Sequence, residues 1–267
     1  MEVLGFTISV LMGVSLGLLG GGGSIFAVPV LVYIFGIDAA HSSMYSNFMV
    51  GITAGIGFYG YYLKKLICFK SALGFLLPAL TAILLFKEYL IPHLPDTFQV
   101  FNIQPVSKSS LILILTGLLM LVASLRMFSK DENKRINRSN GVEPVYLNLS
   151  GIVIGGLTAF IGIGGGFLIV PALVVFAKLP MKKAIGTALF VILIKSVTGF
   201  LFDFNQYQFD WTFLLKFSAF GTLGMLAGIC LSGLVSNEKL KKGFAWLIFG
   251  VGSLVLIKEI FIQPINL

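Results

Sequence analysis

The chain of 267 residues is too apolar for an ordinary soluble domain, because 57% of its residues are hydrophobic and only 11% are charged. Soluble domains carry roughly 25% charged residues. The 19 basic and 11 acidic residues give a formal net charge of +8, but the basic residues gather in short loops rather than along one exposed face. This distribution indicates orientation in a membrane and argues against nucleic-acid binding.

Charged residues, prolines and Asn/Asp clusters divide the chain into eight apolar segments. A membrane-crossing helix needs about 20 residues, and six segments have that length. The first and fifth exceed thirty residues, which as one helix would span roughly 50 Å, and each is broken by glycines near its middle. The sequence therefore predicts an all-α polytopic membrane protein. The segments are residues 3–36, 42–63, 71–91, 109–128, 146–177, 184–202, 211–235 and 243–262.

The two glycine-rich breaks belong to an internal repeat. A shift of 142 residues aligns residues 22–32 with 164–174, including two glycines and a proline, and the same shift aligns 48–75 with 190–217. Apolar matches are frequent by chance in so apolar a chain, but glycine and proline matches at one fixed offset are not. The chain therefore has two related halves.

The charges in equivalent loops indicate how the halves lie in the membrane. Loop 64–70 carries three lysines and its counterpart 203–210 has no basic residue, whereas loop 37–41 has none and its counterpart 178–183 has three. By the positive-inside rule, equivalent loops lie on opposite sides, so the repeats are inverted. Inversion requires an odd number of crossings in each half. Four segments supply an odd number only if the glycine-broken segment enters the membrane and returns as a hairpin.

We therefore expect two inverted repeats of about five helical elements each, opened by short hairpins with glycines at their tips. The basic residues near the middle of the chain place the polar linker in the cytoplasm and both termini outside. The predicted units are residues 1–128 for the first transmembrane repeat, 129–145 for the linker and 146–267 for the second repeat.

Glycine breaks at membrane depth leave backbone groups unpaired, which is tolerated only where protein or water satisfies them. Half-helix N-termini also carry partial positive charge, and in inverted-repeat transporters they face anionic substrate groups. Alternatively, the glycines only allow close helix packing. The residues predicted to contribute to an anion-binding centre are Gly22, Gly23 and Ser24 in the first half and Gly164, Gly165 and Gly166 in the second.

Lys195 is the most informative single residue, because it lies within VILIKSVTG, about ten residues from either end of its segment. At that depth a lysine does not snorkel comfortably, and a cation with no carboxylate at similar depth favours an anion. The structural alternative is a pairing with backbone carbonyls or with Asp203. Its repeat counterpart is Thr53, which is neutral.

Other polar residues on the same two segments either donate hydrogen bonds to an oxyanion or hold helices together. Asn47, Thr53 and Thr187 are the predicted binding residues of this group. Ser46, Ser196 and Thr198 raise the same question.

Enzyme and cofactor signatures are absent from the sequence. Neither glycine run continues as GK[ST], and no dinucleotide fingerprint is complete. His41 and His93 lie near loops without the partners of a zinc site, and Cys68 and Cys230 match no metal or disulfide spacing. We expect no catalysis, no metal and no cofactor.

The runs GLLGGGGSIFAVPVLV at 17–32 and GLTAFIGIGGGFLIVPALVV at 156–175 resemble the paired signature of the TauE/SafE sulfite exporter family, also called the toluene sulfonate uptake permease family. The resemblance covers nearly the whole chain. The first copy departs from the pattern at Ser24, and the run AIGT at 184–187 corresponds to SSMY at 42–45.

The resemblance implies transport of small sulfur-containing anions such as sulfite, thiosulfate, sulfoacetate or organosulfonates across the bacterial inner membrane. The residues themselves predict an inverted-repeat transporter whose halves rock about an anion held near Lys195. The expected partners are this anion and the lipid bilayer, with no nucleic acid, and the oligomeric state stays open. An anion channel, and a membrane scaffold or enzyme without transport, are the alternatives.

Overall fold

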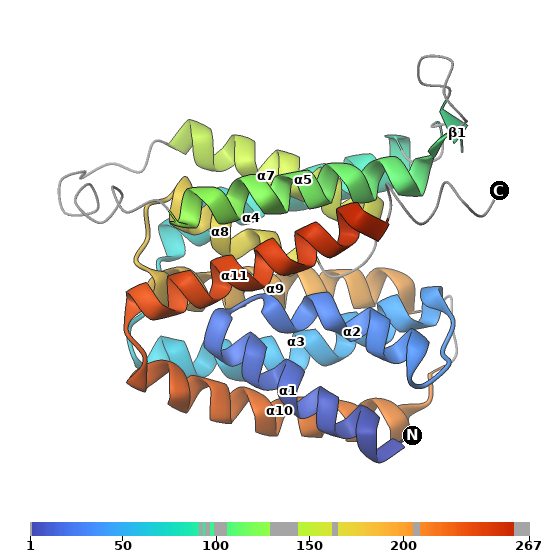
Figure 1. The fold of residues 1–267 in the computed structure, drawn as a ribbon, viewed down its shortest axis with the longest axis horizontal. Coiled ribbons are helices and arrows are strands. Elements are labelled where there is room, and N and C mark those ends of the chain that lie inside the picture. Colours follow the sequence, from blue (N-terminus) through green and yellow to red (C-terminus); the bar gives the residue numbers. More distant parts are fainter. Residues whose placement is uncertain are drawn as a thin grey trace.

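In the computed structural model the chain forms a bundle of α-helices (Figure 1). The structure describes residues 2–90, 93, 97–98, 106–128, 144–161, 165–204 and 209–258. The first half contains α1 (Glu2–Leu19), α2 (Gly22–Tyr33), α3 (Ala39–Leu63), α4 (Phe69–Leu85), the π-helical turn η1 (Phe86–Leu90), the antiparallel strands β1 (Thr97–Phe98) and β2 (Val106–Ser107), and α5 (Lys108–Phe128). The second half contains α7 (Pro144–Ile161), the 3₁₀ turn η3 (Gly165–Leu168), α8 (Ile169–Val175), α9 (Met181–Asp203), α10 (Trp211–Leu234) and α11 (Asn237–Ile257).

The surface of the bundle is suited to lipid. By length and composition, three helices can each cross a membrane, namely Met181–Phe202, Trp211–Leu234 and Asn237–Ile257, and shorter apolar helices accompany them. Large apolar side chains also face outward on several helices, including Leu11 at 61% exposure and Leu215 at 57%. Contiguous apolar surface of this kind is rare on soluble proteins. The prediction of an all-α polytopic membrane protein is confirmed.

The first long apolar segment is a helical hairpin. Gly20 separates α1 from α2 with a φ of +76°, a conformation that glycine adopts without steric cost. The second arm returns along the first, because a Cβ atom at Gly5 would lie 2.1 Å from the ring of Phe35. The fifth segment is arranged similarly: Tyr146 at the start of α7 and Phe176 just after α8 line the same groove. The predicted doubling of both segments is therefore correct.

The helices of the two halves keep the 142-residue offset. α7, α9 and α10 begin 142 residues after α1, α3 and α4, respectively. The turn after each second arm is also repeated. Gly36 and Lys178 both have left-handed backbones, and the N–H groups of Ile37 and Leu179 each bond to a carbonyl six residues earlier, at 3.1 and 3.2 Å. α11 begins only 129 residues after α5, since the first half has extra residues around η1, β1 and β2.

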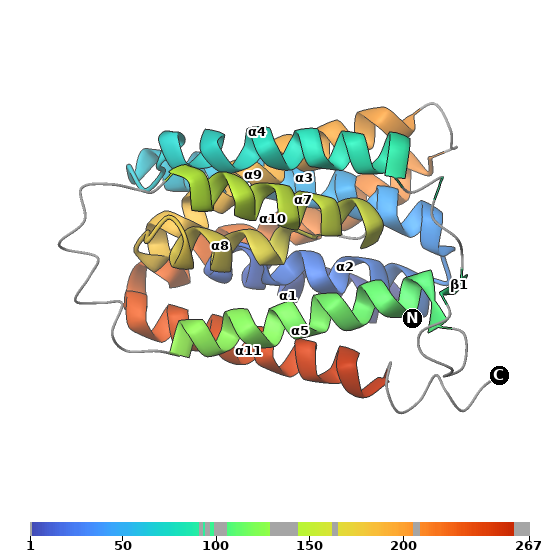
Figure 2. The same ribbon diagram turned by 90° about the horizontal axis from the view of Figure 1, so that it is seen from above.

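The packing between the halves is reciprocal. α1 packs extensively on α10, and α7, the counterpart of α1, packs on α4, the counterpart of α10. α3 and α5 each pack against their own counterparts, α9 and α11, and Figure 2 shows α5 and α11 side by side. These two pairs are antiparallel. In the first, a Cβ atom at Gly51 would lie 3.5 Å from the Ser196 side chain, and one at Gly55 would lie 3.4 Å from Leu193.

Small residues allow the helix pairs between halves to approach closely. A Cβ atom at Gly13 of α1 would lie 1.9 Å from the carbonyl oxygen of Gly221 on α10. At the equivalent position, a Cβ atom at Gly155 of α7 would lie 2.4 Å from the carbonyl oxygen of Ala79 on α4. Backbone contact of this kind is the usual way in which helices associate in membranes, where burial of apolar surface supplies little drive.

Candidate functional site

A small polar cavity lies where α3, α9 and η3 meet. Its volume is about 10 Å³, which is room for about one water molecule. Four of its lining residues have polar side chains, in a bundle whose other interior surfaces are mostly apolar. The lining residues are Ser46, Asn47 and Val50 from α3, Ile192, Lys195 and Ser196 from α9, and Gly166 from η3.

Helical periodicity places these side chains together. The α3 residues are spaced i, i+1, i+4 and the α9 residues i, i+3, i+4, so each group occupies one helix face. The two faces meet closely because small residues lie at the crossing. Beside Gly51, which adjoins Ser196, Gly199 lies opposite Asn47: a Cβ atom there would be 3.2 Å from the Asn47 amide nitrogen.

The polar groups of the cavity have no protein partner in the part of the chain that the structure describes. Ser46 is only 2% exposed and Ser196 only 4%, yet neither hydroxyl makes a hydrogen bond to a described residue, and the same holds for the Asn47 amide and the Lys195 ammonium. An unsatisfied buried polar group costs about 1–3 kcal/mol. A cluster of four such groups is typical of a site that a ligand or water completes.

Lys195 gives this site an uncompensated positive charge. It also lines a second cavity of about 10 Å³ between α4, α7 and α9, where Thr158 is the other polar side chain. An uncompensated charge at membrane depth is costly, so it favours an anionic ligand. The aspartates and glutamates of the described residues lie at helix ends, in η1 or in loops, and are Glu2, Asp38, Glu88, Asp203, Asp210 and Glu238.

Three of the predicted site residues line the polar cavity: Lys195, Asn47 and Gly166. Ser46 and Ser196 join them, although the sequence gave no reason to prefer them over other hydroxyl residues on the same segments. The available signal was their position next to Asn47 and Lys195, which places each on the same helix face as its neighbour's side of the crossing.

Thr53 and Thr187 do not line this cavity. Thr53 is fully buried, and its hydroxyl donates to the Met49 carbonyl oxygen within α3 at 2.8 Å. Its methyl group faces α10, 3.2 Å from the position of a Cβ atom at Gly221. Thr187 Oγ1 accepts a hydrogen bond from the backbone N–H of Cys68 at 3.0 Å. Both residues connect parts of the scaffold.

The glycines of the first hairpin tip are packed against α1 and η3. A Cβ atom at Gly23 would lie 2.3 Å from the Met12 carbonyl oxygen, so α2 lies directly on α1 at this point. A Cβ atom at Gly21 would lie 2.9 Å from the Phe167 Cα atom, so the tip of the first half contacts η3 of the second. Close packing therefore accounts for these positions.

The other predicted glycine-run residues are less fully described. A Cβ atom at Gly22 would lie 2.6 Å from Ser15 Oγ, again in contact with α1. Gly165 is the first residue of η3, and Ser24 lies in the first turn of α2. Gly164 lies outside the described residues.

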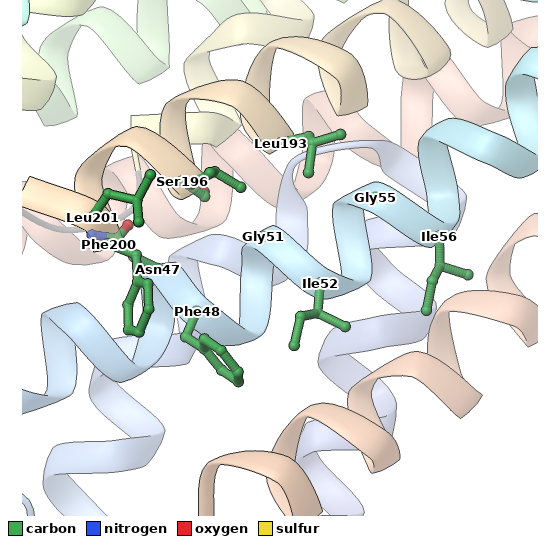
Figure 3. Close-up of a pocket in the computed structure, with 11 residues that line it drawn as sticks. Asn47, Phe48, Gly51, Ile52, Gly55, Ile56, Leu193, Ser196, Phe200 and Leu201 are labelled. Atoms are coloured by element: carbon green, nitrogen blue, oxygen red, sulfur yellow. The ribbon is translucent and has the colours of Figure 1, made fainter. Parts of the chain in front are cut away.

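A larger groove of about 380 Å³ adjoins the polar cavity along α3 and α9 (Figure 3). Asn47 and Ser196 line both spaces, and they are the polar side chains of the groove. The two residues therefore lie on the wall between an apolar groove and the charged cavity. The other groove residues are Phe48, Gly51, Ile52, Gly55, Ile56, Leu193, Val197, Phe200 and Leu201.

Comparison with known proteins assigns the fold to a family. The model of the family described as "Sulfite exporter TauE/SafE" matches residues 4–255. The chain belongs to this family. This TauE/SafE protein is 30% identical over 255 residues to a probable membrane transporter protein of Xylella fastidiosa (strain Temecula1), covering 92% of the chain and 91% of the relative.

More distant relatives have the same kind of name. The probable membrane transporter protein YunE of Bacillus subtilis is 24% identical over 240 residues, covering 79% of this chain and 83% of the relative. A probable membrane transporter protein of Methanocaldococcus jannaschii is 26% identical over 204 residues, covering 72% and 70%. No solved structure matches the chain. The TauE/SafE protein is thus an integral membrane protein of a transporter family.

Proposed function

We propose that this TauE/SafE protein is a secondary transporter that moves a small sulfur-containing anion across the bacterial inner membrane by alternating access. The candidate substrates are sulfite, thiosulfate, sulfoacetate and organosulfonates. The observation that carries the proposal is the polar cavity, where the Lys195 ammonium and three polar side chains without described partners lie together.

The chemistry of the cavity fits an oxyanion. An ammonium group has three hydrogen-bond donors and no acceptor, so its partner must be an acceptor. The Ser46 and Ser196 hydroxyls and the Asn47 amide can donate to further oxygens of the same anion. Hydrogen bonds to a charged partner are roughly twice as strong as neutral ones, which suits a ligand that must leave water for the interior of a membrane protein.

The small volume of the cavity supports a carrier mechanism. At about 10 Å³ it holds a water molecule but no sulfur oxyanion, so α3, α9 and η3 must separate when substrate enters. The contact of Gly21 with Phe167 joins the two hairpin tips beside this site. Rocking of one half against the other about a central site is the usual form of alternating access in repeat-built transporters.

The antiparallel pairing of equivalent helices supports inverted repeats. If α3 and α9 cross the membrane side by side and antiparallel, the two-fold axis that relates them lies in the membrane plane. The proposed units remain residues 1–128, the cytoplasmic linker 129–145 and residues 146–267, with both termini outside. The opposite charges of equivalent loops support the same orientation.

The groove beside the cavity separates the candidate substrates into two groups. An inorganic anion such as sulfite needs only the polar cavity. An organosulfonate also has an organic part, which the apolar groove of about 380 Å³ can accept while Asn47 and Ser196 hold the sulfonate end. Selectivity between the two groups therefore reports whether the groove contributes to binding.

Counterflow in proteoliposomes tests the proposal. Vesicles loaded with unlabelled anion are exposed to labelled sulfite, thiosulfate, sulfoacetate or toluene sulfonate, with sulfate and acetate for comparison. We expect saturable counterflow of at least one sulfur anion, lost in Lys195→Ala and retained in Lys216→Ala, which changes an exposed lysine of α10. Steady anion conductance in a planar bilayer would instead identify a channel, and absence of flux for every sulfur anion would reject the substrate class.

A further inference from the structure

A second large groove runs between α5, α7 and α8 and shares no residue with the polar cavity. Its volume is about 320 Å³. Arg126 and Leu119 of α5 mark its two ends, which the helical rise separates by about 10 Å. The lining residues are Leu119, Val122, Ala123 and Arg126 from α5, Tyr146, Leu149, Ser150, Val153 and Ile154 from α7, Leu168 from η3, and Pro171, Ala172, Val175 and Phe176 from α8 and the residue after it.

The groove is polar at one end and apolar along its length. Arg126 lies in the last turn of α5 and Tyr146 in the first turns of α7, so both lie at the end where the linker joins the two helices. Arg126 makes no ion pair with any residue in the described ranges. The hydroxyl of Ser150 is already used, since it donates to the Leu147 carbonyl oxygen at 2.7 Å.

The groove is also open at its side. Val122 is 47% exposed, Leu149 55% and Val153 47%, so apolar side chains form its outer edge. In a membrane this edge faces acyl chains. A cation beside an apolar trough has the polarity of a phospholipid with a negatively charged headgroup, and basic pockets between transmembrane helices recognise such headgroups.

We propose that this groove binds an anionic phospholipid, with the phosphate held by Arg126 and Tyr146 and one acyl chain lying along α8. Charge complementarity identifies the occupant, because a zwitterionic lipid would bring its own cation to the same place. The equivalent places in the other half are apolar. Leu4 is the counterpart of Tyr146 at the 142-residue offset, and Val255 of α11 is the counterpart of Arg126 when α11 is aligned with α5 from their first residues.

A lipid in this groove would act on the second hairpin. α8 forms one wall of the groove, and Leu168 of η3 lines it as well. Gly166, two residues before Leu168, lines the polar cavity. A bound acyl chain therefore supports the segment that must move when the cavity opens. The binding claim itself requires only the groove and a bilayer, and it stands or falls separately from the transported substrate.

Native mass spectrometry of the full-length protein in detergent tests the proposal, with dioleoyl phosphatidylglycerol and dioleoyl phosphatidylcholine as the two probes. We expect preferential retention of one phosphatidylglycerol. Arg126→Gln should lower its affinity about fivefold, the effect of one basic residue near a charged lipid. Lys258→Gln is the matched control, because it removes an exposed cation at the end of α11, away from the groove. Equal retention of both lipids, or equal effects of the two variants, would overturn the proposal.

A second variant separates the groove from the charge alone. Ala123→Phe fills the groove with a ring and leaves Arg126 in place. We expect it to abolish preferential retention of phosphatidylglycerol while the protein stays monodisperse and keeps its counterflow activity within a few fold. If Ala123→Phe retains the lipid as well as the unmodified protein does, the headgroup binds at the surface and no acyl chain occupies the groove.

Discussion

Tyr45 and Thr187 occupy equivalent positions in the two halves, and each accepts a hydrogen bond from the opposite half. Thr187 Oγ1 accepts from the N–H of Cys68, which caps α4, at 3.0 Å. The Tyr45 hydroxyl accepts from the N–H of Asp210, which caps α10, at 2.9 Å. Cys68 and Asp210 are themselves 142 residues apart. The difference between AIGT and SSMY therefore preserves one physical requirement, an oxygen that reaches the cap of the other half's helix.

Replacing Thr187 with Val should destabilise the protein without abolishing anion binding. The change keeps the shape of the side chain but leaves the Cys68 N–H without its acceptor, at a cost of about 1 kcal/mol or more. Thermal unfolding in detergent measures the effect. Thr198→Val is the control, because that hydroxyl bonds only within α9, to the Ile194 carbonyl oxygen. Equal stability of the two variants would contradict the role assigned to Thr187.

Alanine at Gly155 should prevent correct assembly of the second half. Its Cβ atom would lie 2.4 Å from the Ala79 carbonyl oxygen, so α7 and α4 would have to separate. Gly250→Ala is the control, because no atom lies within 4 Å of a Cβ atom there, and alanine is the better helix former. We expect Gly155→Ala to lower the yield of monodisperse protein sharply and Gly250→Ala to leave it unchanged. A normal yield of Gly155→Ala would mean that the helices do not touch here.

The serines of the cavity should matter for binding where Thr53 does not. Ser196→Ala removes a donor that points to the proposed anion, and loss of a hydrogen bond to a charged group weakens affinity about tenfold. Thr53→Val removes a hydroxyl that bonds within α3 and should leave affinity unchanged. Titration of the purified variants with the best substrate compares them. An equal loss in both variants would point to a general effect of hydroxyl groups on stability.

Equivalent loops should be accessible from opposite sides of the membrane. In a variant lacking Cys68 and Cys230, Asp38→Cys should react with a membrane-impermeant maleimide in intact cells. Lys178→Cys should react only after permeabilisation, because its loop lies on the cytoplasmic side in the proposed topology. Labelling of both positions from the same side would exclude inverted repeats.

Much of the fold follows from the sequence because its signals are local. Segment length and glycine breaks predict both hairpins, and the 142-residue offset predicts where α7, α9 and α10 begin. The spacing of α5 could not be predicted in this way, because residues 86–107 have no counterpart that preserves the offset. An insertion leaves no periodic signal.

The site was only partly predictable, because periodicity fixes which residues share a helix face but not which face meets another helix. Lys195 is identifiable from its charge alone. Thr53 is six residues after Asn47, which at 100° per residue places it on a different face of α3. Thr187 is eight residues before Lys195, about 12 Å away along α9. Only the crossing of α3 and α9 shows that Ser46 and Ser196 share the cavity.

The most direct test of the proposed transport site is anion binding by Lys195→Met, which replaces the ammonium group with an apolar side chain. We predict that the affinity for the best sulfur anion, measured by titration of the purified protein, falls by at least about tenfold. We also predict a melting temperature that is unchanged or higher, since an uncompensated buried charge costs folding free energy. Lys216→Met, on the exposed face of α10, should change neither quantity. Unchanged affinity in a folded Lys195→Met protein would contradict the assignment of the cavity as the anion site.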